Sequence, residues 1–245
     1  MVRAVRWRVG PAGARGVVLV LHGGQVASTA PARPWQPAAV RMRGFVGPLA
    51  RATAGADVAV GLVRYRYRGW NAERADPARD VVEALDAVVA ELGPVPVVLL
   101  GHSMGGRAAL RCAGHPAVTG VVALAPWCPP QEAAEQLAGR ALVTLHGDRD
   151  KVTDPAETRD FAARARAAGA RVAGFEVAGA DHAMLRRSRD WHLAAAGLSA
   201  ALLGVGPAPD EVTRAFAVRG SDRAGLRIAL PRGRRGVSCG VPKER

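Results

Sequence analysis

The sequence predicts one doubly wound α/β domain, with a mostly parallel sheet and helices on both of its faces. Short apolar runs alternate along the chain with segments of helical periodicity, which is the order typical of this fold class. Several runs are nearly continuous hydrophobes, such as residues 17–21, and strands buried on both faces of a parallel sheet have this pattern. The chain has 245 residues, 49% of them hydrophobic, and is long enough to bury a core without a disulfide or a metal.

The predicted strands are short, apolar runs. They cover residues 4–9, 17–22, 58–63, 95–101, 118–125, 141–147 and 171–177. Ligands of doubly wound folds bind at the carboxyl ends of the strands. The residues that follow each strand are therefore the first candidates for a functional site.

The predicted helices lie between these strands. They cover residues 39–54, 76–92, 103–114, 154–169 and 186–203. The 76–92 helix has the clearest signals, because Asp76 and Pro77 suit its first turn and apolar residues form one stripe along it. The 39–54 helix has the weakest, because Pro48 interrupts it after a glycine.

Two segments fall outside this alternation. Residues 25–38 contain three prolines among polar residues and are predicted to form a long loop. Residues 206–245 are rich in proline, glycine and arginine. We therefore expect a folded domain over residues 1–205 and a basic, mostly disordered tail over residues 206–245. The alternative is that the apolar run at 226–230 docks as an extra strand or covers a pocket.

The charge balance is strongly basic, with 34 Lys and Arg residues against 21 Asp and Glu and a net charge of +13. Such an excess can indicate a nucleic acid or another anionic partner. The arginines form no stripe interleaved with aromatic residues, which make up only 4% of the chain. We therefore expect no nucleic-acid partner, and arginine-mediated anion binding remains an alternative function.

The cysteines and the apolar runs predict a cytoplasmic protein. Cys112, Cys128 and Cys239 are odd in number and lack metal-type spacing, which argues for a reducing compartment and against a disulfide framework. No apolar run approaches the roughly 18 residues of a membrane span. The apolar run after the basic N-terminus is too short for a signal peptide. We expect no metal site and no membrane association, and the sequence does not predict an oligomeric state.

The strongest chemical signal is the run from Gly101 to Gly106, which reads Gly-His-Ser-Met-Gly-Gly and stands between a predicted strand and a predicted helix. This is the G-x-S-x-G nucleophile elbow in the context that it requires. The turn is so tight that positions 101 and 105 have no room for a side chain, which explains the glycines there. The same turn exposes Ser103 above the sheet. The amides that begin the following helix favour an anion near the serine.

A serine nucleophile needs a histidine base and an acid that orients it. In this topology the acid and then the histidine follow the serine along the chain. The strand at 141–147 is followed by Asp148, Asp150 and Asp154, of which Asp154 is better explained as a helix cap. His182 follows the last predicted strand, where a base can reach Ser103.

At these residues the chain resembles the α/β-hydrolase family, over about residues 2–204. The matching elements are His22-Gly23-Gly24, the run from Gly101 to Gly106, His146-Gly147-Asp148-Arg149-Asp150 and Asp181-His182. The resemblance implies that Asp150 is the acid, with Asp148 as the fallback, and that His182 is the base. One edge strand found in many relatives is missing here.

The resemblance also implies an oxyanion hole made of two backbone amides. The loop that begins at His22 resembles the oxyanion loop of the family. We expect Met104 to supply one amide and Gly24 the other, with Gln25 as the less favoured donor. Of the remaining histidines, His102 is expected to pack under the elbow, and His146 to be structural.

The connection between the strands at 118–125 and 141–147 is too short for the helical cap that many relatives carry. We therefore expect an open site, with walls formed by aromatic residues that could equally be packing residues. These are Trp35, Tyr65, Tyr67, Trp70 and Trp127. The arginines at 64–68 could attract an anionic substrate, although a solvated loop is the simpler interpretation.

These observations predict a serine hydrolase that cleaves an ester or related acyl bond through Ser103, His182 and Asp150. A carboxylesterase is the first expectation, and a thioesterase or a lactone hydrolase is close behind. No cofactor is needed, and the partner is a small acyl substrate. The alternative is a non-catalytic binding protein of the same fold, which the intact set of serine, acid and base disfavours.

Overall fold

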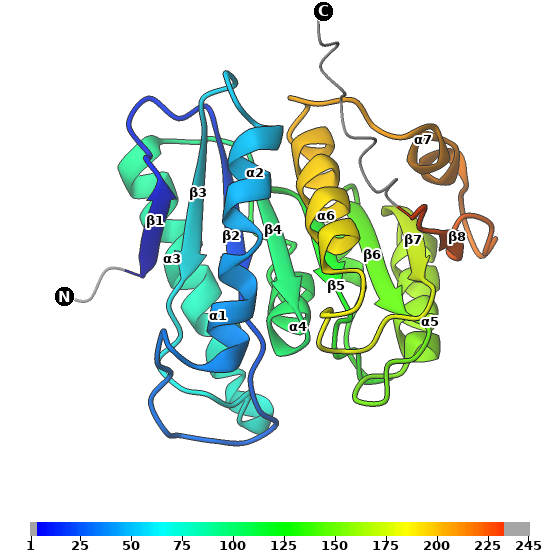
Figure 1. Ribbon diagram of the computed structural model, residues 1–245, viewed down its shortest axis with the longest axis horizontal. Coiled ribbons are helices and arrows are strands. Elements are labelled where there is room, and N and C mark those ends of the chain that lie inside the picture. The colour runs from blue at the N-terminus through cyan, green and yellow to red at the C-terminus, as the bar shows by residue number, and fades with distance from the viewer. Residues whose placement is uncertain (1–3, 233–245) are drawn as a thin grey trace, which may run out of the picture.

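The computed structural model describes residues 4–232, and this part of the chain forms three layers, with a sheet between two layers of helices (Figure 1). The eight described strands follow the order β1-β3-β2-β4-β5-β6-β7-β8 across the sheet. β1 is antiparallel to β3, and every other neighbouring pair is parallel. The predicted α/β fold with a mostly parallel sheet is confirmed.

The elements lie close to the predicted ranges. The strands are β1 (Val5–Val9), β2 (Gly16–Leu21), β3 (Val58–Val63), β4 (Val97–His102), β5 (Val118–Leu124), β6 (Ala141–Gly147), β7 (Arg171–Val177) and β8 (Ile228–Ala229). The α-helices are α1 (Pro37–Arg43), α2 (Val46–Ala52), α3 (Asp76–Leu92), α4 (Met104–Arg111), α5 (Pro155–Ala167), α6 (Ser188–Leu202) and α7 (Asp210–Ala217). Two short 3₁₀ turns are η1 (Ala72–Arg74) and η2 (Glu135–Leu137).

The two faces of the sheet carry separate apolar cores. α3, α4 and α5 cover one face, where Leu85 and Phe161 are buried against the strands. α1, α2, α6 and α7 cover the other face, where Leu49 and Trp191 are buried. In Figure 1, α1, α2 and α6 lie in front of the sheet and α3, α4 and α5 behind it. Successive residues of a buried strand such as β2 point to opposite faces of the sheet, so one strand contributes side chains to both cores.

The predicted helix at 39–54 consists of two short helices. α1 ends at Arg43 and α2 begins at Val46, so the break falls at residues 44–45 and not at Pro48. Pro48 is the third residue of α2. Its missing N–H costs nothing there, because the first amides of a helix have no acceptor within the helix.

Residues 206–232 are not the disordered tail that composition predicted. α7 belongs to this segment, and β8 pairs in parallel with β7, with Ile228 opposite Phe175. The alternative interpretation, an extra strand within residues 226–230, describes this part of the chain. Residues 233–245 of the predicted tail lie outside the described residues.

A buried arginine explains why so few apolar residues suffice to order this segment. Arg166 on α5 is only 1% exposed. Its guanidinium donates hydrogen bonds to the carbonyls of Asp222, Ala224 and Val172 at 2.5, 2.8 and 2.7 Å. The buried apolar side chains of the segment are Val212, Ala215 and Leu226. Composition alone misses such an arrangement, because the partner that satisfies the loop carbonyls lies far away in the sequence.

No helix within residues 4–232 is both long enough and apolar enough to cross a membrane.

Candidate active site

Ser103 lies in the turn between β4 and α4, where its backbone has φ 54° and ψ −119°. A residue with a side chain rarely adopts this conformation, and the strain is typical of a nucleophile elbow. A Cβ on Gly101 would lie 2.3 Å from the carbonyl oxygen of Gly105. A Cβ on Gly105 would lie 2.6 Å from the carbonyl oxygens of Leu21 and His22. Both positions therefore require glycine, as the elbow predicts.

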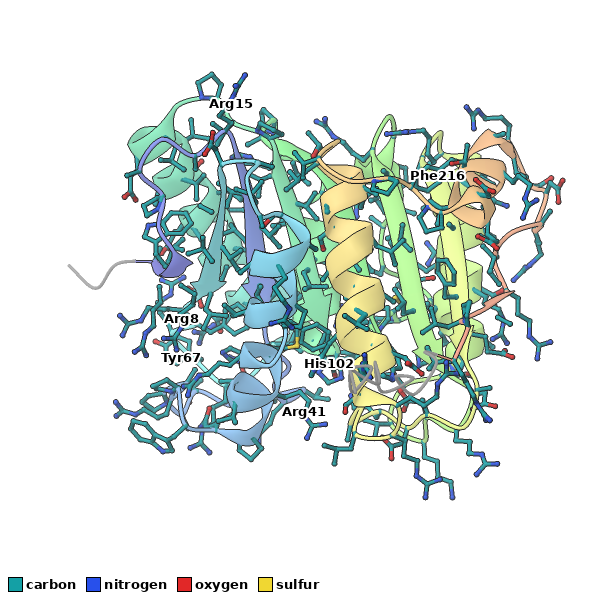
Figure 2. The ribbon with its side chains drawn as sticks, turned by 45° about the horizontal axis from the view of Figure 1, so that its top comes forward. Arg8, Arg15, Arg41, Tyr67, His102 and Phe216 are labelled. Atoms are coloured by element: carbon teal, nitrogen blue, oxygen red, sulfur yellow. The ribbon has the colours of Figure 1, made fainter. Side chains whose placement is uncertain are left out.

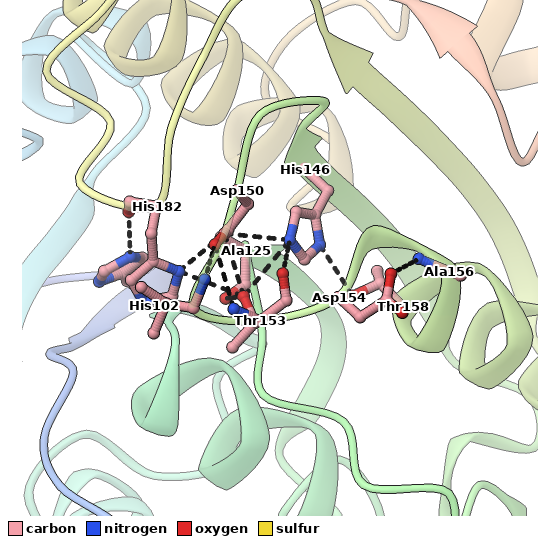
Figure 3. Close-up of polar contacts among 10 residues, drawn as sticks. His102, Ala125, His146, Asp150, Thr153, Asp154, Ala156, Thr158 and His182 are labelled. Carbon is pink, nitrogen blue, oxygen red and sulfur yellow. Dashed lines mark hydrogen bonds and ion pairs between the residues drawn. The ribbon is translucent and has the colours of Figure 1, made fainter.

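Asp150 and His182 come from the loops after β6 and β7 and meet at the carboxyl end of the sheet. His182 Nδ1 lies 2.7 Å from Asp150 Oδ2 (Figure 3). The Asp150 side chain is fully buried, with 0% of it exposed. An ionised carboxylate only accepts hydrogen bonds, so Nδ1 of His182 carries the proton and Nε2 is left as a free base.

Further donors converge on the Asp150 carboxylate. Oδ1 accepts from the amides of Val152 and Thr153 at 2.8 and 3.0 Å. Oδ2 also accepts from the Thr153 hydroxyl at 3.0 Å and from His146 Nε2 at 3.1 Å. Burial by itself would raise the pKa of Asp150, but the hydrogen bonds from His146, His182 and the backbone amides hold that pKa far below its usual range. Asp150 is therefore ionised at any physiological pH.

Asp148, the fallback acid, has a different role in the structure. Its Oδ1 accepts a hydrogen bond from the Gly179 amide at 2.6 Å. The residue is exposed. This contact joins two surface turns, which is the local structural role open to an aspartate in a turn. Of the two acids, Asp150 is the one that contacts His182.

His102 has a role that the sequence did not predict. Its ring is buried, as expected, but it also lies against the His182 ring, with 4.8 Å between the centroids. His102 Nε2 donates to the backbone carbonyl of His182 at 2.9 Å. Burial, followed by the neighbouring His182 ring, lowers the pKa of His102 to about 3. A neutral His102 thus ties the His182 loop to the residue next to Ser103.

His146 and Thr153 also support Asp150; His146 was expected to be structural, whereas Thr153 was not singled out from the sequence. His146 Nδ1 pairs with the Thr158 hydroxyl at 2.9 Å, which orients the ring toward Asp150. The Thr153 hydroxyl lies 3.1 Å from His182 Nδ1 as well as close to Asp150. The only sequence signal for the contact between His146 and Asp150 was their four-residue separation. That spacing does not predict the turn that brings the two side chains together.

Within residues 4–232 no hydrogen bond joins Ser103 to His182, and the two are linked instead through His102. Ser103 is half-buried at the surface of the site. A catalytic hydrogen bond is often long or poorly aligned before substrate binds. The structure thus brings Asp150 and His182 into direct contact and places Ser103 beside their loop.

The predicted oxyanion donors differ in their availability. Met104 is the first residue of α4, so its amide has no acceptor within the helix. The Gln25 amide donates to the carbonyl of Arg68 at 2.9 Å and is therefore engaged. The Gly24 amide donates no hydrogen bond in the described part of the chain. A Cβ on Gly24 would lie 2.3 Å from the Arg68 carbonyl oxygen and 2.4 Å from Met104 Cε, so only glycine fits there.

A short loop walls the site on the side of β5. The chain between β5 and β6 contains only the turn η2 among its regular elements, so no helical cap is built there. The Trp127 amide donates to the Ser103 carbonyl at 3.2 Å. Arg107 contacts two indole rings that meet edge to face, with its Cζ 4.0 Å from the Trp70 centroid and 4.3 Å from that of Trp127. Tyr65 and Trp70 are buried packing residues, whereas Trp35 is 70% exposed.

No group of three or more His, Cys, Asp or Glu side chains within residues 4–232 is arranged to hold a metal ion.

The comparison with protein families identifies the chain. The model of the alpha/beta hydrolase domain matches residues 39–202. The chain belongs to the α/β-hydrolase family. A comparison with curated proteins found no match.

Solved structures of a serine hydrolase and of esterases are similar to this chain in fold. A serine hydrolase without a lid from Xanthomonas campestris is 18% identical, with a TM-score of 0.53 over 80% of this chain and 84% of that one. Esterase 2 of Thermogutta terrifontis is also 18% identical, with a TM-score of 0.59 over 85% and 98%. The esterase domain of a Rhodothermus marinus protein is 17% identical, with a TM-score of 0.56 over 82% and 93%. At these identities the likeness establishes the shared fold.

Proposed function

We propose that the protein is a serine hydrolase of the carboxylesterase type, acting on a small acyl ester through an acyl-enzyme intermediate. The observation that carries this proposal is the 2.7 Å contact between His182 Nδ1 and the buried Asp150 carboxylate, beside a serine held in a strained elbow. The contact supports a catalytic role because it fixes the histidine tautomer that a general base needs.

In the first half of the reaction, Ser103 Oγ attacks the acyl carbon and His182 Nε2 takes the hydroxyl proton. The carbonyl oxygen becomes an oxyanion, which the amides of Gly24 and Met104 stabilise. Losing one such donor typically costs about 2.7–4 kcal/mol of transition-state stabilisation. The tetrahedral intermediate collapses, the bond to the alcohol oxygen breaks, and His182 gives its proton to the leaving alcohol.

In the second half, water attacks the acyl-enzyme and gives a proton to His182 Nε2. The second tetrahedral intermediate releases the carboxylic acid, and Ser103 recovers its proton from His182. Asp150 stays ionised throughout, orients the imidazole and stabilises the imidazolium that forms twice in each cycle. The short loop between β5 and β6 leaves the site open to small esters.

Labelling with a fluorophosphonate tests the proposal directly, because this probe reacts with activated serines. Trypsin releases residues 80–107 as one peptide, in which Ser103 is the only residue with a hydroxyl side chain. We expect the label on this peptide in the wild type and in the control Ser221→Ala, and none in Ser103→Ala. Folded wild-type protein that takes up no label on the peptide would refute the serine-hydrolase proposal.

A further inference from the structure

A pocket of about 410 Å³ lies beside the candidate active site, at the carboxyl ends of β2 and β3. This is the end of the sheet where His102 and Tyr67 lie, opposite Arg15 and Phe216 (Figure 2). The volume is in the range of small-molecule sites, which run from about 300 to 1,000 Å³. The pocket adjoins the proposed oxyanion loop, because His22 lines it and a Cβ on the next residue, Gly23, would lie 3.4 Å from Ser103 Cβ.

The lining of the pocket is divided into an apolar part and a cationic part. The apolar lining residues include Ala4 before β1, Val20 of β2, Leu62 and Val63 of β3, Ala32 and Pro34 of the loop before α1, and Ala39 of α1. The cationic residues are Arg6, Arg33, Arg43, Arg64 and Arg66. The two acids of the lining are Asp80 and Glu83. A ligand that matched both parts would have an apolar body and an anionic group.

The two acids do not neutralise the arginines. Arg66 Nε lies 2.5 Å from Asp80 Oδ1, and Arg66 Nη2 lies 3.3 Å from Glu83 Oε1. Arg66 alone therefore forms the ion pairs with both Asp80 and Glu83. Among the described residues, Arg6, Arg33, Arg43 and Arg64 have no ion pair with a carboxylate.

Two of the pocket arginines, Arg6 and Arg43, repel a neighbouring arginine that does not line the pocket. Partial burial, followed by the charges of Arg6 and Arg43, lowers the pKa of this neighbour, Arg8 in β1. Arg43 donates to the Pro34 carbonyl, and Arg33 lies 5.8 Å from the Trp35 ring. These neutral contacts orient the guanidinium groups without cancelling their charge. An anion among them would relieve the repulsion and complete their hydrogen bonds.

We propose that this pocket binds a ligand with a short apolar body and one anionic group, such as a carboxylate or a phosphate. The apolar body lies against Val20 and Leu62, and Arg6 and Arg64 hold the anion. The ligand has two possible sources, the free end of the substrate itself or a separate anionic molecule. Only the first source rests on the proposed esterase function.

Calorimetric titration with octanoate tests the proposal, with octanamide as the neutral match of equal length. We expect octanoate to bind wild-type protein at least about tenfold more tightly than octanamide, a difference of about 1.4 kcal/mol. The double variant Arg6→Gln/Arg64→Gln should lose at least about fivefold in octanoate affinity and leave octanamide unchanged. Arg214→Gln, an exposed arginine on α7, is the control and should bind octanoate as the wild type does.

Equal affinities for octanoate and octanamide, or octanoate binding that the double variant does not weaken, would overturn the proposal. The melting temperature of each variant shows whether it is folded. Calorimetry needs no activity, so binding that persists in a protein that the fluorophosphonate does not label would separate the pocket from the proposed function.

A kinetic comparison distinguishes the two sources. If the anion is part of the substrate, kcat/KM for the p-nitrophenyl monoester of adipate, divided by that for p-nitrophenyl hexanoate, falls at least fivefold in the double variant. If it is a separate molecule, that ratio stays constant while octanoate still binds. Both results support the pocket, and they assign its ligand differently.

Discussion

Replacing Asp150 by asparagine is the sharpest test of the proposed mechanism, because the change keeps the shape of the side chain and removes its charge. Oδ1 faces two backbone amide donors, and Oδ2 faces His182, His146 and the Thr153 hydroxyl. If the NH₂ group of the new asparagine took the Oδ1 position, its N–H groups would face the backbone N–H groups of Val152 and Thr153. If it took the Oδ2 position, it would face the proton on His182 Nδ1.

The second orientation forces His182 into the other tautomer, with its proton on Nε2. Nε2 then cannot accept the proton of Ser103, and the positive charge that develops on the imidazole loses its counterion. Loss of the triad aspartate in a serine protease lowers kcat about 10⁴-fold, which corresponds to about 5.5 kcal/mol. We expect a loss of similar size for Asp150→Asn.

Hydrolysis of p-nitrophenyl butyrate measures this loss, with the melting temperature as the check on folding. Asp148→Asn is the matched control. Among residues 4–232 its carboxylate accepts a hydrogen bond only from the Gly179 amide in an exposed turn, so we expect less than about a tenfold loss of kcat/KM. Comparable activities of folded Asp150→Asn and wild type, or the larger loss in Asp148→Asn, would show that the acid is wrongly assigned.

Three further predictions concern the fold, the pH dependence and the site. Arg166→Met should lower the free energy of unfolding by about 2–4 kcal/mol, because it leaves buried carbonyls unpaired; an unchanged urea midpoint would contradict the role of Arg166. The pKa of His102 is about 3 in the folded protein and about 6.5 in the unfolded chain. Between these two values the unfolded chain binds more protons than the folded protein, so the free energy of unfolding decreases as the pH falls through this window. The loss from pH 7 to pH 5 should be about 2 kcal/mol and should shrink in a folded His102→Gln variant, whereas equal losses in both proteins would assign the effect to other groups. In a series of p-nitrophenyl esters, kcat/KM should rise little beyond a few acyl carbons, since an open site buries few CH₂ groups at about 0.8 kcal/mol each; a steep rise toward long chains would reveal a deep apolar channel.

The sheet was predictable because its strands are locally coded. The run at 17–21 is apolar throughout, and its short length and three valines favour a strand buried on both faces over a buried helix. The elbow was predictable because its motif is contiguous, and Gly101 is required by a contact with Gly105 within the same turn. Gly105 is required by Leu21 and His22 of the adjacent strand, so its physical cause is not local although the motif that reveals it is.

The supporting contacts of the site were not predictable in the same way. His102 reaches the His182 carbonyl across 80 residues, and Arg166 reaches Asp222 across 56. Each pairing depends on which strands are neighbours and on how long the loops are. From their composition, residues after 205 were expected to be too polar to order. Composition does not reveal the hydrogen bonds that Arg166 of α5 donates to this segment.

The wall near Ser103 shows how an α/β hydrolase without a helical cap can keep a defined site. Glu132, with 0% of its side chain exposed, binds Arg107 Nε at 2.5 Å and Arg111 Nε at 2.6 Å. Both arginines belong to α4, the helix that begins directly after Ser103, and Arg107 in turn contacts the Trp127 ring. Removing one partner of a buried ion pair costs about 3–5 kcal/mol. The wall is therefore fixed to the same helix that begins after Ser103, so Trp127 keeps its place beside Ser103 without a helical cap to hold it.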